Sequence, residues 1–417
     1  MKRFSFTLLL ILLLTLAGCG GRQEVAPETP PAEPPAEEET QPRYLPDTPK
    51  EEPEKADEGD GPSEEELTAQ KAAADAARVA EILGGMTTEE KVGQLFFARC
   101  LFNDMEDKIA QYHLGGVLLF TQDYKDAADN WLSKEDFVAK LEGYQAAAGD
   151  VPLFIGSDEE GGTVTRASRN PNLFPEKSKS PQALYASGGL GAVLNDTAQK
   201  SYLLRSIGVN GNFAPVADVS TDPNDFIYER SLGRNAAETM AYVAGVAAVM
   251  KDSNVGSVLK HFPGYGNNAD THTGVAVDER PIEWFRQSDF LPFMGGIRAG
   301  APFVLVSHNI VKCMDDKLPA SLSPAVHEIL RSELGSEGVV LTDDLAMEAV
   351  AAYAKDGSAA VLALLAGNDM VVTSDFWTQI PQVLAAVEDG TIPMETIDAA
   401  CTRVLYAKLA LGLLEEK

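Results

Sequence analysis

Short apolar runs alternate along the chain with longer segments of helical periodicity. There are eight such runs, at residues 94–98, 116–120, 152–156, 211–216, 256–259, 302–306, 338–342 and 369–373. This alternation is typical of repeated βα units that form a parallel sheet. A closed barrel and an open, doubly wound sheet share this pattern, so the residues that follow each run decide between them.

Polar residues follow several of the runs at the point where each predicted strand ends. They are Asp158, Asp218, Lys260 with His261, His308 and Asp343. Such groups are costly to bury unless they have a partner or a ligand. Eight units with polar groups at the same end favour an α/β fold of the (β/α)8 TIM-barrel type, because barrels carry their chemistry at the carboxyl ends of the strands.

The barrel is expected to occupy residues 63–417 as a single domain. About 350 residues suit one large barrel better than two ordinary domains. A first helix is predicted to begin after Ser63, which is a suitable N-cap with Glu66 three residues later, and to end at Gly84 and Gly85.

Residues 1–18 have the pattern of a lipoprotein signal peptide. A basic start is followed by an apolar run at 4–16 and by Leu16-Ala17-Gly18-Cys19, which has the form of a lipobox. The apolar run is shorter than the ~20 residues that a membrane-spanning helix needs. We therefore expect lipidation of Cys19 and anchoring to the extracytoplasmic side of the cell membrane, with an ordinary signal peptide as the alternative.

Residues 19–62 are predicted to form a disordered acidic tether. Between residues 20 and 62 the chain holds ten prolines, thirteen acidic residues and four basic residues, with almost no large apolar side chain. Such a segment cannot bury enough surface to fold. A spacer between membrane and barrel is the preferred interpretation, and an acidic protein-binding segment is the alternative.

The overall charge and the remaining cysteines exclude several classes of protein. The formal net charge is −29 and there are no basic clusters, which argues against binding of nucleic acid. Cys100, Cys313 and Cys401 have no metal-type spacing and are expected to be buried thiols. There is no P-loop and no dinucleotide fingerprint, so we expect neither a cofactor nor a metal.

The segment 260–274, K-H-F-P-G-Y-G-N-N-A-D-T-H-T-G, concentrates the polar chemistry of the chain. Its glycines and Pro263 exclude a helix and predict a long mobile loop after the strand. In an extended loop Asp270 and His272 project from the same side, so the carboxylate can orient the imidazole and favour its charged form. A lone Asp-x-His is more often a solvated or turn-capping histidine, so this pair gains weight only from its surroundings.

Asp343 and Asp344 follow the seventh apolar run and precede a predicted helix at 345–353. Aspartate is a favoured helix N-cap, which is a sufficient explanation for one of the two. Asp344 is the better cap because it directly precedes the helix, and this places Asp343 at the strand end, directed into the mouth of the barrel.

Five separate motifs resemble glycoside hydrolase family 3, in its β-N-acetylglucosaminidase branch. The segment 260–274 resembles K-H-F-P-G-H-G…D-x-H, and 342–347 resembles S-D-D-L-x-M. Residues 158–166 resemble D-x-E-G-G-R-V-x-R, while 212–218 and 229–233 resemble F-A-P-V-x-D and x-R-S-F-G. The resemblance extends from Met86 to about Leu414. Thr163 and Tyr265 depart from the Arg and the His of the family pattern.

The resemblance implies specific roles for these residues. Asp343 matches the catalytic nucleophile, and Asp270 with His272 matches the acid/base dyad. The implied substrate-binding residues are Asp158, Arg166, Arg230, Lys260, His261 and His308. His308 is as suited to supporting the site as to contacting substrate, and Asp218 is evenly divided between holding the site together and touching the sugar.

The resemblance also implies an activity, namely a retaining exo-β-N-acetylglucosaminidase that removes terminal β-linked GlcNAc from peptidoglycan fragments or chitin-type oligosaccharides. The expected partners are thus a GlcNAc-containing glycan and, through Cys19, the membrane. The nearer alternatives are a related β-N-acetylglucosaminide phosphorylase and another β-glycosidase of the family. The more distant alternative is a catalytically inactive sugar-binding lipoprotein.

Overall fold

The computed structural model describes residues 63–100, 103–268, 276–347, 350, 353 and 358–414. All of these belong to the part of the chain that runs from Pro62 to Lys417. The predicted signal peptide, Cys19 and the predicted tether lie outside the described residues, as do Asp270 and His272 of the predicted dyad.

Eight parallel strands form the central sheet, in the order β10-β1-β2-β3-β4-β5-β7-β9. They are β1 (Phe96–Arg99), β2 (Gly116–Leu119), β3 (Phe154–Ser157), β4 (Gly211–Asn212), β5 (Gly256–Phe262), β7 (Phe303–Val306), β9 (Val339–Thr342) and β10 (Val371–Thr373). A parallel bridge between Leu341 and Met370 joins the two ends of the sheet. The predicted (β/α)8 barrel is therefore confirmed, and each of the eight apolar runs contributes one strand.

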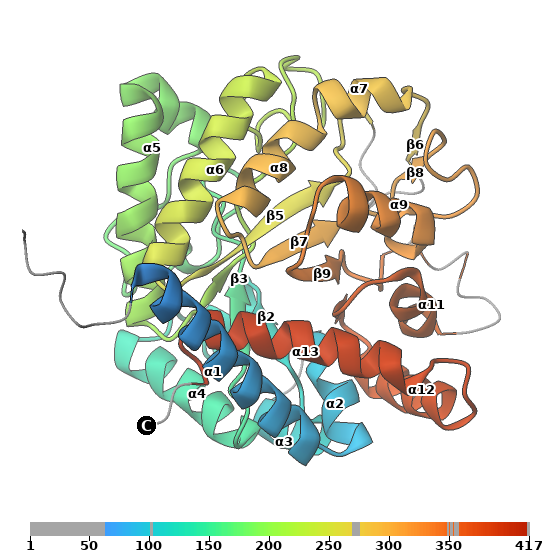
Figure 1. Cartoon of the computed structure of the whole chain (residues 1–417). Helices are drawn as coiled ribbons and strands as arrows, with labels where there is room; N and C mark the ends of the chain where they lie inside the picture. The colour runs from blue at the N-terminus through green and yellow to red at the C-terminus, as the bar shows by residue number, and fades with distance from the viewer. Residues whose placement is uncertain are drawn as a thin grey trace, which may run out of the picture. The chain divides into compact units, whose positions relative to one another are not determined.

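Helices surround this sheet, as Figure 1 shows. They are α1 (Glu64–Gly85), α2 (Thr88–Gln94), α3 (Met105–Tyr112), α4 (Lys134–Ala148), α5 (Pro181–Ser206), α6 (Ala236–Asp252), α7 (Ile282–Gln287), α8 (Phe290–Arg298), α9 (Pro324–Glu328), α11 (Ala359–Ala366), α12 (Phe376–Glu388) and α13 (Met394–Ala410). A separate small sheet pairs β6 (Val277–Asp278) with β8 (Ile310–Val311).

The first helix begins and ends where the sequence predicts. Ser63 caps α1 by accepting a hydrogen bond from the Glu66 amide, and the Glu66 carboxylate accepts one from the Ser63 amide in return. The helix ends at Gly85 and packs against the last helix, α13, in blue and red in Figure 1. The two ends of the described barrel unit are thus in contact.

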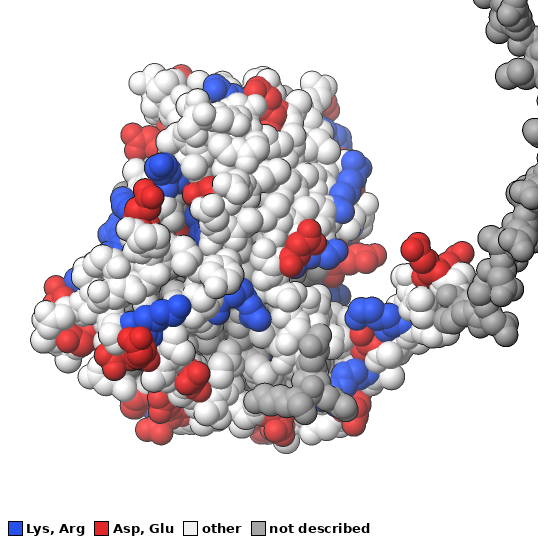
Figure 2. Space-filling view, turned by 90° about the vertical axis from the view of Figure 1, so that its left-hand side faces the viewer, with Lys and Arg blue, Asp and Glu red and all other residues white. Residues whose placement is uncertain are grey.

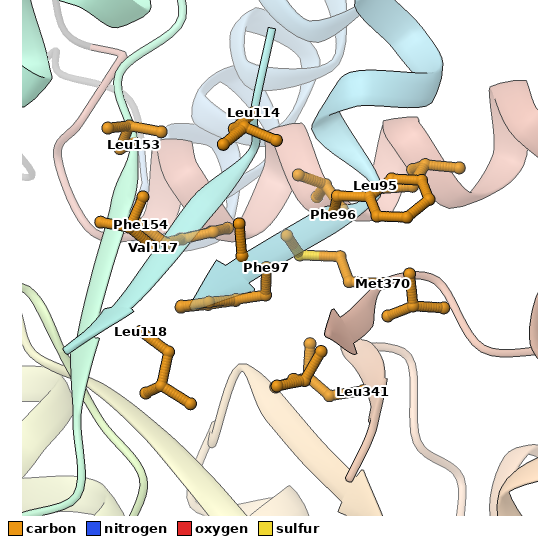
Figure 3. Close-up of a cluster of buried hydrophobic side chains, with 14 of the residues drawn as sticks. Leu95, Phe96, Phe97, Leu114, Val117, Leu118, Leu153, Phe154, Leu341 and Met370 are labelled. Carbon is orange, nitrogen blue, oxygen red and sulfur yellow. The ribbon is translucent and has the colours of Figure 1, made fainter. Parts of the chain in front are cut away.

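The barrel interior is filled by large apolar side chains from neighbouring strands (Figure 3). Phe97 stacks on Phe154 at a ring-centre distance of 6.3 Å, and Phe213 meets Phe97 edge-on at 5.3 Å. These residues are almost completely buried, so the interior is a packed core, as is usual for this barrel type. Such packing fixes the strand ends that carry the polar residues.

The three cysteines within the described residues do not share one environment. All three are free thiols, but only Cys401 is buried, whereas Cys100 is half-buried and Cys313 is exposed. The prediction of buried thiols was therefore wrong for Cys313, which follows the short edge strand β8 near the surface.

The outer surface shows no single dominant patch of charge on the face drawn in Figure 2, where acidic and basic side chains are interspersed. Among the described residues, no helix is both long enough and apolar enough to cross a lipid bilayer.

Candidate active site

The predicted polar residues gather at the carboxyl ends of the barrel strands. Asp158 directly follows β3, and Asp343 directly follows β9. His308 lies two residues beyond β7, and Asp218 lies beyond the short strand β4. Because all eight strands are parallel, these positions belong to the same end of the barrel.

Lys260 and His261 were expected just beyond a strand that stops at residue 259. The strand β5 instead continues through both residues to Phe262. The extension is possible because the neighbouring strand still offers a partner, with Phe262 pairing with Val306 after an irregularity in the register. The two side chains are therefore held by a strand and not by a loop, and both are buried.

The ammonium group of Lys260 lies between two carboxylates. Its Nζ is 2.7 Å from Asp158 Oδ1 and 2.6 Å from Glu160 Oε1. Asp158 is also 3.7 Å from the Arg166 guanidinium, through Oδ2 and Nη2. The lysine thus fixes both carboxylates, and it carries three N–H donors in total.

Glu160 is a site residue to which the sequence analysis assigned no role. Its carboxylate forms a bidentate pair with Arg230, with Nε to Oε2 at 3.0 Å and Nη2 to Oε1 at 2.8 Å. Burial alone would raise the pKa of Glu160, but Arg230 and Lys260 together hold it well below its usual range. Its place before the two glycines of the D-x-E-G-G motif was the available signal.

The two glycines after Glu160 allow the chain to turn sharply there. Gly161 and Gly162 both have positive φ, at 102° and 66°. A Cβ on Gly161 would lie 2.0 Å from the Lys179 carbonyl oxygen, and one on Gly162 would lie 2.7 Å from Ser180 Cβ. Only glycine satisfies both the backbone conformation and this close approach, so the turn that positions Glu160 depends on them.

His261 is held by Asp218 and Arg230. Asp218 Oδ2 accepts hydrogen bonds from the His261 amide at 3.1 Å and from Nδ1 at 2.8 Å, and Oδ1 accepts one from the Tyr265 amide at 2.7 Å. Arg230 Nη2 lies 3.1 Å from His261 Nε2, and because a guanidinium can only donate, Nε2 is the acceptor. Asp218 is buried under these three bonds, so of its two predicted roles the geometry matches holding the site together.

Asp343 sits on a turn that is bonded on several sides. Its Oδ1 accepts a hydrogen bond of 2.8 Å from the Asp344 amide. The Asp344 carbonyl accepts one from His308 Nε2 at 3.1 Å, while His308 Nδ1 lies 2.7 Å from Ser321 Oγ. Both ring nitrogens of the fully buried His308 thus face protein atoms, so the structure places it behind this turn in a supporting position and not on the cavity wall.

The helix expected at 345–353 does not begin directly after Asp344. Leu345 and Ala346 form a turn and Met347 a bend, and the next residue described as helical is Val350. The Asp344 carboxylate does bond the Ala346 amide, at 3.0 Å, so it caps this turn and not the first turn of a helix.

A cavity of about 480 Å³ brings most of the predicted residues together. Its wall includes Asp158, Arg166, Arg230, Lys260, His261 and Asp343. Arg99, Phe120, Asp344 and Met347 also line it, and none of these was predicted as a site residue. One wall therefore presents fixed cations and carboxylates that can bind hydroxyl groups, and Asp343 provides a carboxylate beside them.

The two departures from the family pattern lie in different environments. Tyr265 is buried, and its ring packs edge-on against the His261 ring with centres 5.1 Å apart. Thr163 is exposed, and its carbonyl oxygen accepts a long hydrogen bond of 3.4 Å from Arg169 Nη2. Tyr265 thus contributes to the packing around the site, whereas Thr163 lies on the protein surface.

Within the described part of the chain, no group of three or more His, Cys, Asp or Glu side chains is arranged to hold a metal ion. Of the carboxylates on the cavity wall, Asp158 is paired with Lys260 and Arg166, and Asp344 is paired with Arg99.

Several known proteins are similar to this chain in sequence or in fold. Beta-hexosaminidase LpqI from Mycobacterium tuberculosis is 29% identical over 316 residues, which cover 73% of this chain and 78% of the relative. A beta-hexosaminidase from Xanthomonas campestris is 30% identical over 308 residues, covering 72% and 85%. The solved structure of a glycoside hydrolase family 3 beta-N-acetylglucosaminidase from Paenibacillus superposes with a TM-score of 0.72 at 29% identity, over 80% of this chain and 64% of the other.

Residues 87–407 match the family described as "Glycosyl hydrolase family 3 N terminal domain". This match covers most of the barrel, including every described residue of the cavity wall. The chain belongs to glycosyl hydrolase family 3 and is an enzyme.

Proposed function

We propose that the enzyme is a retaining exo-β-N-acetylglucosaminidase. The observation that carries this proposal is the cavity in which the Asp343 carboxylate lies beside the cluster of Asp158, Lys260 and Arg230. The names of the relatives, beta-hexosaminidase and beta-N-acetylglucosaminidase, support the same sugar specificity. A pocket of this size accommodates a terminal sugar together with part of its leaving group.

In the proposed mechanism Asp343 attacks the anomeric carbon while His272 protonates the departing glycosidic oxygen. The bond to the leaving group breaks as the glycosyl ester of Asp343 forms. His272, now neutral, then takes a proton from water, whose oxygen attacks the anomeric carbon and releases Asp343. Two displacements at the same carbon retain its configuration. Asp270 orients the imidazole in both steps.

Substrate binding in this proposal rests on the paired charges. Asp158 accepts hydrogen bonds from sugar hydroxyls, and Lys260 donates the N–H that its two carboxylates leave available. Arg230 offers the remaining donors of its planar fork. His261 was predicted to donate a hydrogen bond as well, but its ring nitrogens face Asp218 and Arg230, so we assign it to holding Arg230 in place.

The proposed substrates are peptidoglycan fragments or chitin-type oligosaccharides outside the cell membrane. This part rests on the lipobox that ends at Cys19. Cys19→Ala should release the protein from the membrane fraction or stall its processing. Recovery of the wild-type protein as a wholly soluble secreted species would contradict the proposed membrane anchoring through Cys19.

Turnover of a panel of aryl β-glycosides tests the activity. We expect the N-acetylglucosaminide to be cleaved fastest, and Asp343→Asn to abolish turnover while leaving the thermal unfolding transition unchanged. The product formed with and without phosphate separates the alternatives, because hydrolysis gives free GlcNAc whereas phosphorolysis gives the sugar 1-phosphate. Absence of turnover on every glycoside would favour a sugar-binding protein and contradict the proposal.

A further inference from the structure

Arg99 lies at the end of β1 and lines the same cavity as Asp343. Its Nη1 is 3.2 Å from Asp344 Oδ2, in an ion pair whose side chains are 29% and 16% exposed. The guanidinium carbon also lies 3.8 Å from the centre of the Phe120 ring, a distance suited to a cation–π contact. No sequence motif pointed to Arg99, and the mechanism above does not use it.

Asp344 connects Arg99 to the proposed nucleophile. Its amide donates to Asp343 Oδ1, its carbonyl accepts from His308, and its carboxylate is shared between the Ala346 amide and Arg99. Every polar group of Asp344 is therefore bonded, and the Asp343 carboxylate rests on one of these bonds. A change in the Asp344 side chain would be transmitted directly to the orientation of Asp343.

The ion pair also has an electrostatic consequence. Asp343 and Asp344 are adjacent carboxylates, and like charges at short range disfavour ionisation of each other. Of the other cations on the cavity wall, Arg230 and Lys260 pair with Glu160, and Arg166 lies near Asp158. Arg99 is the cation on that wall that is paired with Asp344.

We propose that Arg99 is a positioning residue for the reaction, which acts through Asp344. It holds the turn beneath Asp343 in one orientation, and it offsets the charge of Asp344 so that Asp343 is ionised at working pH. This inference rests on the proposed function, because it takes Asp343 as the nucleophile.

The test compares Arg99→Gln, Asp344→Asn and the double variant in pH profiles of kcat/KM. The substrate is whichever aryl β-glycoside the wild type turns over fastest, so loss of the expected sugar specificity would count against the proposed function alone. Arg99→Gln should lower kcat roughly tenfold or more, since small misplacements at a reacting group are costly. It should also raise the apparent pKa of the acid limb by roughly one unit, because Asp344 is left uncompensated.

The double variant distinguishes a role of Arg99 through Asp344 from a direct role of Arg99. Asparagine at 344 retains an oxygen for the Ala346 amide but removes the charge, so the acid limb should return towards its wild-type position. Asp344→Asn alone should move the limb to lower pH, because Arg99 then acts unopposed. The single variant Asp344→Asn keeps the inference testable even if Arg99→Gln fails to fold.

Two matched variants serve as controls. Arg286→Gln breaks an exposed ion pair with Glu333 and should leave the profile unchanged. Arg99→Lys should restore the acid limb but only part of kcat, because lysine supplies the charge without the planar fork. If Arg99→Gln lowers activity equally at every pH, or mainly raises KM with no recovery in the double variant, Arg99 acts structurally or on the substrate, and the inference is overturned.

Discussion

Arg230 and Glu160 form a bidentate ion pair in which the Glu160 side chain is 1% exposed and the Arg230 side chain 15% exposed. The pair links the turn after β3 to the loop after β4, two segments far apart in sequence. It directs the free edge of the guanidinium at His261 and the cavity. Its consequence is that Glu160, which has no proposed chemical role, determines where Arg230, a proposed substrate-binding residue, lies.

Glu160→Gln should destabilise the fold and weaken substrate binding together. The variant leaves Arg230 and Lys260 without their shared counter-charge, and breaking a buried pair in this way costs about 3–5 kcal/mol. Because the pKa of Glu160 is depressed in the folded state, its contribution is complete above the ordinary glutamate value and is lost only as the pH falls below it.

Denaturant unfolding from pH 3 to 8, with KM measured alongside, checks this prediction. The difference in free energy of unfolding between the wild type and Glu160→Gln should be largest near neutral pH and should decrease below about pH 4. Glu333→Gln, in the exposed pair with Arg286, is the matched control and should change little. A difference in free energy of unfolding that does not change with pH would contradict a charged Glu160–Arg230 pair.

Asp218→Asn should lower kcat/KM without removing any group that touches the substrate. One oxygen of Asp218 accepts two bonds from His261, and an amide nitrogen in that place would meet those donors instead. The free energy of unfolding should also fall, by about 1–3 kcal/mol. Thermal unfolding measures the loss of stability, and the pH profile of kcat/KM measures the loss of activity. An unchanged KM would show that Asp218 does not hold the binding residues in place.

The barrel was predictable because its signal repeats. Eight apolar runs in order specify eight strands, and glycines or polar residues mark where most of them end. The end of β5 was misjudged because Lys260 and His261 are polar, yet their pairing with Asp158, Glu160 and Asp218 makes them suitable for a buried strand. Those partners lie some 40 to 100 residues away in sequence, so local pattern does not reveal them.

Glu160 and Arg99 were missed for the same physical reason. Each forms an ion pair with a residue that is distant in sequence, Glu160 with Arg230 and Arg99 with Asp344. Glu160 did stand in a recognisable motif, whereas Arg99 had no signal beyond its place at the end of a predicted strand. His308 was expected either to contact substrate or to support the site, and the fold places its ring against the Asp344 carbonyl.

Lys408 offers a test of stability remote from the active site. It is fully buried, its Nζ donates to Gln94 Oε1, and it lies 5.3 Å from the centre of the Phe154 ring. Burial lowers the pKa of Lys408 to about 7. Between pH 7 and about 10 the unfolded chain therefore binds a proton that the folded chain does not, and the wild type gains stability as the pH rises.

Lys408→Met should remove this pH dependence. The variant should be more stable relative to wild type at pH 7 and below than at pH 10, because the charged ammonium is costly to bury only while it is protonated. Guanidinium unfolding at pH 6, 8 and 10 measures the difference, with the exposed Lys71→Met as control. An equal difference at all three pH values would mean that Lys408 does not titrate in this range.

His272→Ala should separate good leaving groups from poor ones. Protonation matters greatly when a sugar alkoxide departs and little when an acidic phenol does, and general acid help is worth ~10²- to 10⁴-fold. The variant should lose most activity on a natural disaccharide but keep much of the glycosylation step on a dinitrophenyl glycoside. Azide should restore turnover of that substrate, and Asp270→Asn should give a milder form of the same pattern.

Equal loss of both substrates, with no effect of azide, would make His272 a binding or structural residue. The proton donor would then have to be found elsewhere in the mouth of the barrel.

The identity of the nucleophile is the central claim, and covalent trapping measures it most directly. A fluorinated, slowly turned-over N-acetylglucosaminide should inactivate the wild type, and mass spectrometry of the digested protein should place one sugar on Asp343. Asp343→Asn should take up no label, while Asp218→Asn, which alters only the support of the binding residues, should still be labelled, only more slowly. A label on Asp344 or Asp158, or inactivation without any covalent adduct, would contradict the account.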